Sequence, residues 1–398
     1  MHAHPRDKLT GEAAYLFRHV LLRDAAYEMQ LPSDRATLHA AALHALESAV
    51  GGRPPVMAAL APGQGDTHVP HATDSLALEL AAHAEQAGDD EQWQELRRLY
   101  LRRAAAQAER QFQLALASSL YSKFSGLLHG AARAEALRRA ADALRNGGRS
   151  LEAEPLLLQA LEELRGCASA AGDGACLTNL ALVYFYTGRQ ELAASTLQSA
   201  MVALSAADSD ALTASALSTL GMLHTTAGDY GRALEYQREA LSIHRRMGDD
   251  GHSAKALANL GLTELSAGHP DAAERSYHEG IRLARARNDV RTLGVCTGNL
   301  AGLCYETGRY EEAASLYPQA LRLHRAAGNQ RFEATCRCDY AVCLTALGRT
   351  DEAMHVWRQG VDTLREIGDT LALQRKVEGM HRACAKAGVP PFDSPEAA

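Results

Sequence analysis

The chain has 398 residues, a net charge of −7 and 46% apolar residues, of which few are aromatic. This composition can bury a core of close-packed helices, and its acidic balance argues against a nucleic-acid footprint, which needs a basic patch. The first 20 residues lack an apolar signal core, no apolar run reaches bilayer length, and eight cysteines in so long a chain make no disulfide framework. We therefore expect a cytoplasmic protein that is neither secreted nor membrane-spanning.

The first fifty residues are predicted to form two helices, with Pro32 near the start of the second. Residues 15–47 read YLFRHVLLRDAAYEMQLPSDRATLHAAALHALE. They resemble the winged-helix end of the ATPase module in bacterial STAND signalling ATPases, where a Phe-Arg-His, an Arg-Asp-x-Ala-Tyr and a Leu-His precede helical repeats. The matching residues are Phe17, Arg18, His19, Arg23, Asp24, Ala26, Tyr27, Leu38 and His39.

The catalytic core of such an ATPase is not found in this sequence. No G-x-x-x-x-G-K-[ST] phosphate loop occurs, and no glycine is followed by lysine. The resemblance therefore implies that residues 1–50 are a helical remnant of the ATPase module. It also implies that the chain corresponds to the C-terminal, helical-repeat part of a STAND regulator.

Residues 51–130 carry helical patterns without a clear repeat. Residues 51–72 contain prolines and glycines without helical periodicity, which predicts a flexible linker. Residues 73–130 are predicted to be degenerate helical repeats, with one helix at 75–87, a second through Trp93 and Tyr100, and a third at 112–127.

A 40-residue internal repeat covers residues 131–370. Each unit contains a glycine that is followed five residues later by an alanine. A glycine adopts the left-handed conformation at a helix end without a steric cost, so each glycine is predicted to end one helix before a second begins. The glycines are Gly148, Gly188, Gly228, Gly268, Gly308 and Gly348, and the alanines are Ala153, Ala193, Ala233, Ala273, Ala313 and Ala353.

One such helical hairpin cannot bury its apolar face alone, so we expect the six hairpins to stack into a solenoid. This pattern resembles the tetratricopeptide repeat, whose usual period is about 34 residues. The shared features are a Leu-Ala or Leu-Gly pair before the glycine, an alanine five residues after the glycine and a small residue twelve residues after it. The resemblance implies an all-α, right-handed superhelix of about six repeats, preceded by the degenerate hairpins. Residues 371–387 are predicted to be a capping helix and 388–398 a disordered tail.

A candidate ligand groove follows from the same resemblance. In this family the position nine residues before the glycine faces the concave wall, and an asparagine there can both donate to and accept from the main chain of an extended peptide. Apolar residues are expected beside this polar series. The predicted peptide-binding groove consists of Asn179, Thr219, Asn259, Asn299, Asp339, Met222, Leu262 and Tyr305. The alternative interpretation is a solvated polar surface without a ligand.

Other residue types that could carry chemistry are interpreted as packing. Cys336 and Cys338 are two residues apart and would point to different sides of a helix. Cys176, Cys296 and Cys336 share one repeat position, which alanine fills in other units, so these thiols are predicted to pack in a tight seam. We predict no catalytic residue, cofactor or metal. The residues expected to pack as knobs between helices are Tyr277, Tyr317 and Trp357.

The sequence thus predicts a non-enzymatic scaffold that binds a peptide or protein segment in bacterial signalling or transcriptional regulation. It predicts neither a nucleic-acid nor a membrane partner. Two alternatives stay open. The chain could be the sensor fragment of an ATPase-coupled kinase, cyclase or transcription activator whose catalytic core is absent from this chain, or it could self-associate, with the groove taking its own tail.

Overall fold

The computed structural model describes residues 2–3, 15–16, 27–63 and 68–392, and the fold is all-α apart from one minimal strand pair. The strands β1 (His2–Ala3) and β2 (Tyr15–Leu16) pair antiparallel. Of the residues that resemble a STAND ATPase module, Phe17, Arg18, His19, Arg23, Asp24 and Ala26 lie outside the described residues.

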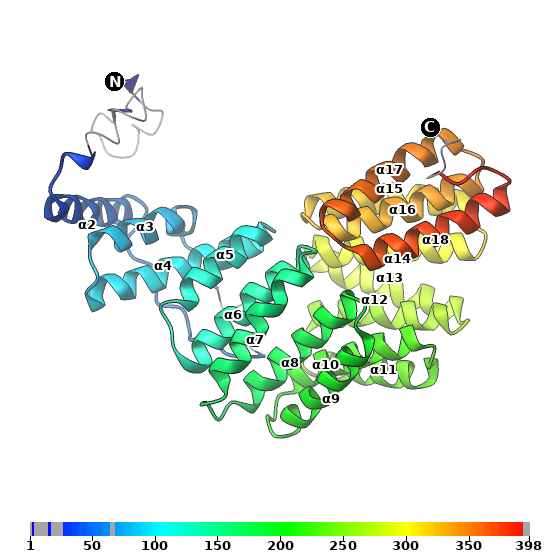
Figure 1. The fold of residues 1–398 in the computed structure, drawn as a ribbon, viewed down its shortest axis with the longest axis horizontal. Helices are drawn as coiled ribbons and strands as arrows, with labels where there is room; N and C mark the ends of the chain where they lie inside the picture. The colour runs from blue at the N-terminus through cyan, green and yellow to red at the C-terminus, as the bar shows by residue number, and fades with distance from the viewer. Residues whose placement is uncertain (1, 4–14, 17–26, 64–67, 393–398) are drawn as a thin grey trace.

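The remaining elements are helices joined mostly by short turns, and they wind from one end of the molecule to the other (Figure 1). The elements before the 40-residue repeats are α2 (Pro32–Ala49), η1 (Ala72–Leu76), α3 (Ala77–Ala87), α4 (Glu91–Arg110) and α5 (Leu114–Ser125). The helices that follow are α6 (Gly130–Asn146), α7 (Ser150–Leu164), α8 (Ala170–Tyr186), α9 (Gln190–Ser205), α10 (Asp210–Ala227), α11 (Tyr230–Arg246), α12 (Asp250–Ser266), α13 (Pro270–Ala286), α14 (Val290–Glu306), α15 (Tyr310–Ala326), α16 (Gln330–Ala346), α17 (Thr350–Glu366) and α18 (Thr370–Ala387).

The 40-residue period equals two helices and two tight turns. In the unit of α12 and α13, each helix has 17 residues and each is followed by a three-residue turn. All six glycines predicted to end the first helix of a unit have a positive φ, between +73° and +87°. The prediction that these glycines break the chain into helical hairpins is confirmed.

A second series of left-handed residues follows the second helix in five of the six units. It also repeats every 40 residues, and its members are Asp208, Gly248, Asn288, Gly328 and Gly368. Glycine, asparagine and aspartate tolerate this conformation best. The next residue often caps the following first helix, because the carboxylates of Asp249, Asp289 and Asp369 accept backbone N–H groups of α12, α14 and α18.

Small residues permit the close helix contacts within each unit. A Cβ on Gly261 would lie 2.5 Å from the ring of Tyr277, so no larger residue fits between α12 and α13 there. The aromatic series predicted as knobs is buried, since Tyr277, Tyr317 and Trp357 are all under 5% exposed. The prediction of core positions is confirmed for all three.

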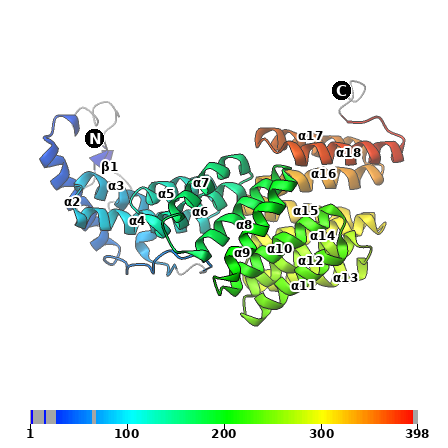
Figure 2. The ribbon, with the colours of Figure 1, turned by 60° about the horizontal axis from the view of Figure 1, so that its bottom comes forward.

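The first helices of the units form one layer and the second helices the other. Each first helix from α6 to α16 contacts the next first helix, whereas the second helices contact mainly first helices. The layer whose members lie closer together is the inner layer of a curved solenoid, and Figure 2 shows the resulting rows of helices. Helix α18 packs against α16 and takes the place of a further first helix.

Parts of the solenoid far apart in sequence touch across its interior. The guanidinium of Arg291 in α14 donates a hydrogen bond to Oδ1 of Asn146 in α6, at 2.9 Å. Arg331 in α16 lies 4.5 Å above the ring of Tyr186 in α8 and pairs with Asp369 at 2.6 Å. The Arg291–Asn146 contact thus joins α14 to α6, and the Arg331–Tyr186 contact joins α16 to α8.

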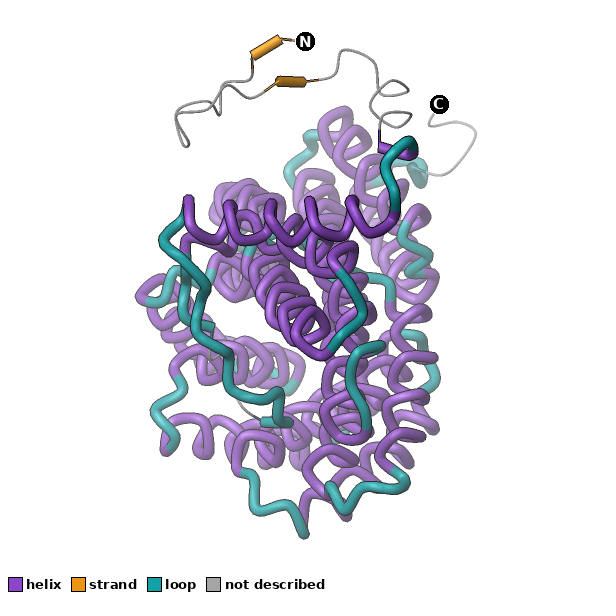
Figure 3. Tube along the Cα trace, turned by 90° about the vertical axis from the view of Figure 1, so that its left-hand side faces the viewer, coloured by secondary structure: helices purple, strands orange, loops and turns teal. Residues whose placement is uncertain are grey.

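The segment between α2 and η1 appears as a long loop in Figure 3. The backbone carbonyl of Met57 accepts a hydrogen bond from Arg102 in α4, at 3.4 Å. Gly63 lies against the start of α10, because a Cβ there would meet Ser209 Oγ at 3.0 Å and Leu212 Cγ at 3.1 Å. The segment thus contacts both the N-terminal helices and the repeats. That residues 51–72 are flexible stays a prediction.

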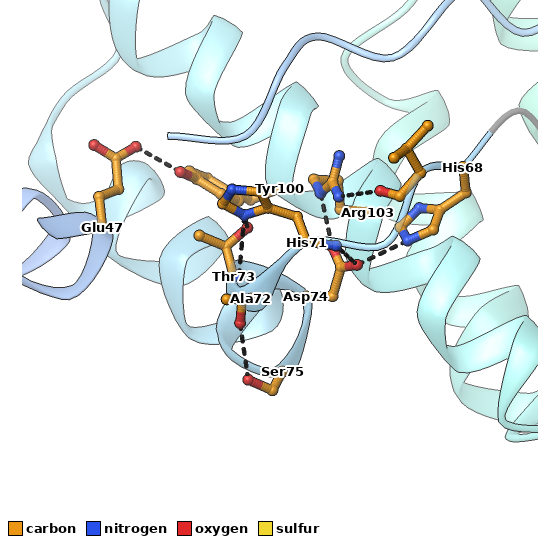
Figure 4. A network of polar contacts seen from close by, with 10 residues as sticks. Glu47, His68, His71, Ala72, Thr73, Asp74, Ser75, Tyr100 and Arg103 are labelled. Carbon is orange, nitrogen blue, oxygen red and sulfur yellow. Dashed lines mark hydrogen bonds and ion pairs between the residues drawn. The ribbon is translucent and has the colours of Figure 1, made fainter. Parts of the chain in front are cut away.

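A buried polar network attaches the end of this loop to α4 (Figure 4). Asp74 Oδ1 accepts from Arg103 Nε at 2.7 Å, and Asp74 Oδ2 lies 2.8 Å from His68 Nε2. Nearby, Glu47 of α2 accepts from the hydroxyl of Tyr100 at 2.5 Å and pairs with Arg53 at 2.8 Å. The charged side chains of this network thus lie inside the N-terminal hairpins, and each contacts a polar or oppositely charged partner.

No helix among the described residues is long and apolar enough to cross a bilayer.

Candidate functional site

The inner layer holds the predicted groove residues, on α8, α10, α12, α14 and α16. Asn259 of α12 and Asn299 of α14 are half-buried. Neither side-chain amide makes a hydrogen bond to any other residue that the structure describes. Each amide therefore keeps its two donors and its acceptor available to a ligand.

Asn179 and Thr219 differ from this pair because they are more deeply buried. Asn179 is 9% exposed, and its Nδ2 has no hydrogen-bond partner among the described residues. Thr219 is 3% exposed, and its hydroxyl donates to the Ser215 carbonyl of its own helix at 3.0 Å. The hydroxyl proton of Thr219 is thus used within its own helix, and its place in the groove stays a prediction.

Asp339, at the C-terminal end of the series, is already paired. Its two carboxylate oxygens lie 2.6 and 2.7 Å from Nζ of Lys376 in α18. The sequence reasoning did not include Lys376, although Lys376 lies 40 residues after Cys336, and Gly388 extends the glycine series with a φ of +70°. The continued period was the signal that α18 repeats the placement of a first helix.

The predicted apolar members of the groove are unevenly exposed. Leu262 is 47% exposed, whereas Met222 and Tyr305 are half-buried. The ring of Tyr305 lies 5.5 Å from that of Tyr310. Burial and then Tyr310 raise the pKa of Tyr305, and Asp339 of the next helix adds a smaller contribution.

Four of the buried thiols are held in the protonated, unreactive form. Burial raises the pKa of Cys176 and Cys296 to about 12, and that of Cys304 and Cys343 to about 11. A thiol is nucleophilic only as a thiolate, so these groups are inert at neutral pH. Their burial agrees with the packing interpretation. No group of three potential metal ligands occurs in the described ranges.

Two buried histidines make stability sensitive to acid. Burial and then Arg291 lower the pKa of His324 to about 4. Burial and then His252 lower the pKa of His244 to about 4, with Lys255 adding to the effect and Asp249 opposing it. The folded chain therefore keeps both rings neutral at a pH where the unfolded chain would bind a proton.

We expect the free energy of unfolding to keep its full value above pH 6.5 and to fall as the pH drops from 6.5 to about 4. Each histidine would contribute a loss of roughly 2–4 kcal/mol by the acid end. Urea unfolding at several pH values should show this slope, and His324→Gln should flatten it. The exposed His278→Gln is the control and should keep the wild-type slope. An unchanged slope in His324→Gln would contradict the assignment.

The comparisons with known proteins agree with this arrangement. Residues 212–286 and 293–366 match the model of the tetratricopeptide repeat family. The search of curated proteins found no match.

Several solved structures share the fold at low sequence identity. The Rap conjugation gene regulator of the plasmid pLS20, solved with a peptide, is similar with a TM-score of 0.59 and 15% identity, over 77% of this chain and 92% of that chain. The quorum sensor NprR from B. thuringiensis, in its apo form, is similar with a TM-score of 0.54 and 19% identity, over 72% of this chain and 82% of that chain.

A STAND protein with a tetratricopeptide repeat sensor from Pyrococcus horikoshii is similar with a TM-score of 0.51 and 16% identity. The match covers 95% of this chain and 56% of that chain, so this chain spans about half the length of that STAND protein. At these identities the likeness is one of fold. The family match, the glycine-ended hairpins and the two-layered arrangement together show that the chain carries tetratricopeptide repeats over residues 212–286 and 293–366.

Proposed function

We propose that this chain is a non-enzymatic scaffold that binds an extended peptide or protein segment along its inner layer. The observation that carries the proposal is the pair of unused amides at Asn259 and Asn299, on adjacent first helices. A peptide main chain presents a donor and an acceptor at every residue, which is the complement of such amides. Fold relatives solved with a peptide or named a quorum sensor support the proposal.

The experiment uses a synthetic pool of random-sequence peptides of about eight residues, which span roughly 26 Å when extended. Peptides retained by the immobilised chain are identified by mass spectrometry, and the affinity of the best one is measured by fluorescence anisotropy. Retention of no peptide above the background of a denatured control would refute the proposal.

Changing both Asn259 and Asn299 to alanine should weaken binding of that peptide tenfold or more. The change removes about two to four hydrogen bonds, each worth roughly 0.5–1.5 kcal/mol net. The thermal unfolding temperature should change little, because neither amide bonds within the fold. Arg275→Ala, on the exposed face of α13, should bind as the wild type does. Full affinity in the folded double variant would place recognition elsewhere.

A second function has specific support. The fold similarity to the STAND protein covers almost this whole chain, and Tyr27 and His39 of the STAND-like segment are joined by a 2.9 Å hydrogen bond. We propose that the peptide-binding scaffold serves as the sensor of an ATPase-coupled signalling regulator. The purified chain itself should not bind ATP, because its sequence lacks the phosphate loop. Micromolar ATP affinity by calorimetry would contradict this assignment.

A further inference from the structure

Helix α9 differs from the other second helices on the face that it exposes. Four exposed residues follow one another on this face at intervals of three, four and three residues, and we call them the α9 stripe: Leu192, Ser195, Ser199 and Val202. Leu192 is 48% exposed and Val202 is 69% exposed, so both ends of the stripe present a large apolar side chain to solvent. The helix lies at the lower rim of the molecule in Figure 1.

The 40-residue period allows a direct comparison of α9 with the second helices of the other five units. At the four equivalent positions each of those helices carries at least two charged residues. They are Glu152 and Glu162 on α7, Arg232, Glu235 and Glu239 on α11, Arg275, Glu279 and Arg282 on α13, Glu312 and Arg322 on α15, and Glu352 and Asp362 on α17. The α9 stripe carries no charge, and Glu191 is the single charged residue of its helix. The uncharged face is thus special to one unit of the outer layer.

The two serines of the stripe can be buried at little cost. The hydroxyl of Ser195 donates to the Leu192 carbonyl, and that of Ser199 donates to the Ser195 carbonyl, each at 3.2 Å. A hydroxyl that already donates within its own helix leaves no donor unsatisfied when an apolar surface covers it. Both side chains are also short, so they permit a second helix to approach closely. The stripe therefore suits contact with another helix.

The α9 stripe is complementary to a second copy of itself. When two α9 helices lie antiparallel about a two-fold axis at the level of Leu197, Leu192 faces Val202 of the second copy and Ser195 faces Ser199. Apolar side chains then meet at both ends of the contact, and short side chains meet at its centre. The intervals of three and four residues are those that keep a seam between two helices. A patch that matches itself in this way is what a two-fold contact requires.

Charge also favours a second copy as the occupant of this face. The chain has a net charge of −7, so two copies repel each other on average. The α9 stripe adds no repulsion to the contact, whereas the equivalent faces of α11 and α13 would bury several charges there. A different partner recognised by electrostatic complementarity would need charges on this face.

We propose that the chain forms a two-fold dimer through the α9 stripe, with the two α9 helices antiparallel. The second helix of the preceding unit, α7, exposes Leu151 and Leu158 on the same outer layer, by 64% and 48%. The four side chains of the stripe alone bury less than the roughly 800 Å² per partner of a stable interface, so we expect a reversible dimer at micromolar concentration. The inner layer stays free, so the dimer does not depend on the proposed peptide-binding function.

Sedimentation velocity of the full chain, from low to high micromolar concentration, tests the dimer. The wild type should shift toward twice the mass of one chain as its concentration rises. Ser195→Arg and Ser199→Glu should each raise the dissociation constant about tenfold or more, because each places an unpaired charge in the contact. Both residues are exposed in the single chain, so circular dichroism should show an unchanged fold.

The two variants mixed together test the antiparallel orientation. In an antiparallel pair the introduced arginine of one chain faces the introduced glutamate of the other, so an equimolar mixture should regain the dimer. A parallel pair would place position 195 against 195 and 199 against 199, and mixing would restore nothing. Ser315→Arg and Gln319→Glu are the matched controls, because Ser315 and Gln319 hold the equivalent exposed positions on α15. Both controls should dimerise as the wild type does.

The possible results are distinct. A wild type that stays monomeric at every concentration would overturn the dimer and leave the peptide-binding proposal untouched. A dimer that survives both Ser195→Arg and Ser199→Glu, or that is lost equally in the α15 controls, would overturn the α9 stripe as its interface. Loss of the dimer in each variant without recovery in the mixture would overturn the antiparallel arrangement.

Discussion

Replacing Asp74 by alanine is expected to lower the free energy of unfolding of the N-terminal hairpins by roughly 3–5 kcal/mol. Asp74 is 8% exposed, and its partner Arg103 is 1% exposed. Burial alone would raise the pKa of Asp74, but the backbone N–H of His71, Arg103 and His68 together hold it below its usual value. Removing the carboxylate leaves the Arg103 guanidinium buried with the Val69 carbonyl as an uncharged partner.

The loss should appear in urea unfolding followed by circular dichroism. A matched control is Glu279→Ala, which breaks the exposed pair between Glu279 and Arg245. Exposed pairs are worth about 1 kcal/mol at most, so this variant should unfold close to the wild type. If Asp74→Ala cost no more than Glu279→Ala, the buried network would not hold the loop end to α4.

Replacing Tyr277 by alanine should cost roughly 3–5 kcal/mol, the usual range for removing a large buried aromatic side chain. Tyr277 is fully buried and belongs to a core cluster that also contains Leu300 and Leu303 of α14. The ring fills the space that Gly261 leaves open in α12. Because neighbouring repeats share interfaces, the damage should extend into α14 and its partner helix.

The matched control for this prediction is Tyr277→Phe. The hydroxyl of Tyr277 is buried and has no hydrogen-bond partner among the described residues. Removing it should therefore be neutral or slightly stabilising, because an unsatisfied polar group is lost and the ring stays in place. Hydrogen exchange can follow both variants repeat by repeat. A large loss in Tyr277→Phe, or protected amides in α14 of Tyr277→Ala, would contradict the packing described.

The repeat could be predicted because its determinants are local. A glycine such as Gly268 ends a helix through its own backbone freedom, and Ala273 permits a close contact wherever two helices meet. The sequence analysis missed the second left-handed series because aspartate and asparagine share it with glycine, as at Asp208 and Asn288. It also predicted residues 371–387 as a capping helix without recognising that Gly388 continues the 40-residue glycine series.

The candidate site could be predicted only in part. Repeat position alone identifies the inner-layer series, so Asn259 and Asn299 could be named before the fold was known. The position of a residue in the repeat does not predict the local contacts of its side chain; the hydroxyl of Thr219, for example, donates to a carbonyl of its own helix. Nor does it predict partners from other helices, such as Lys376 of α18, which pairs with Asp339.

The sequence by itself determined the helices, their turns and their stacking, because those depend on residues at most one unit apart. The tertiary structure decided which charges meet, because the curvature of the solenoid is the sum of small rotations at every helix contact. That curvature brings Arg291 to Asn146, which is 145 residues away.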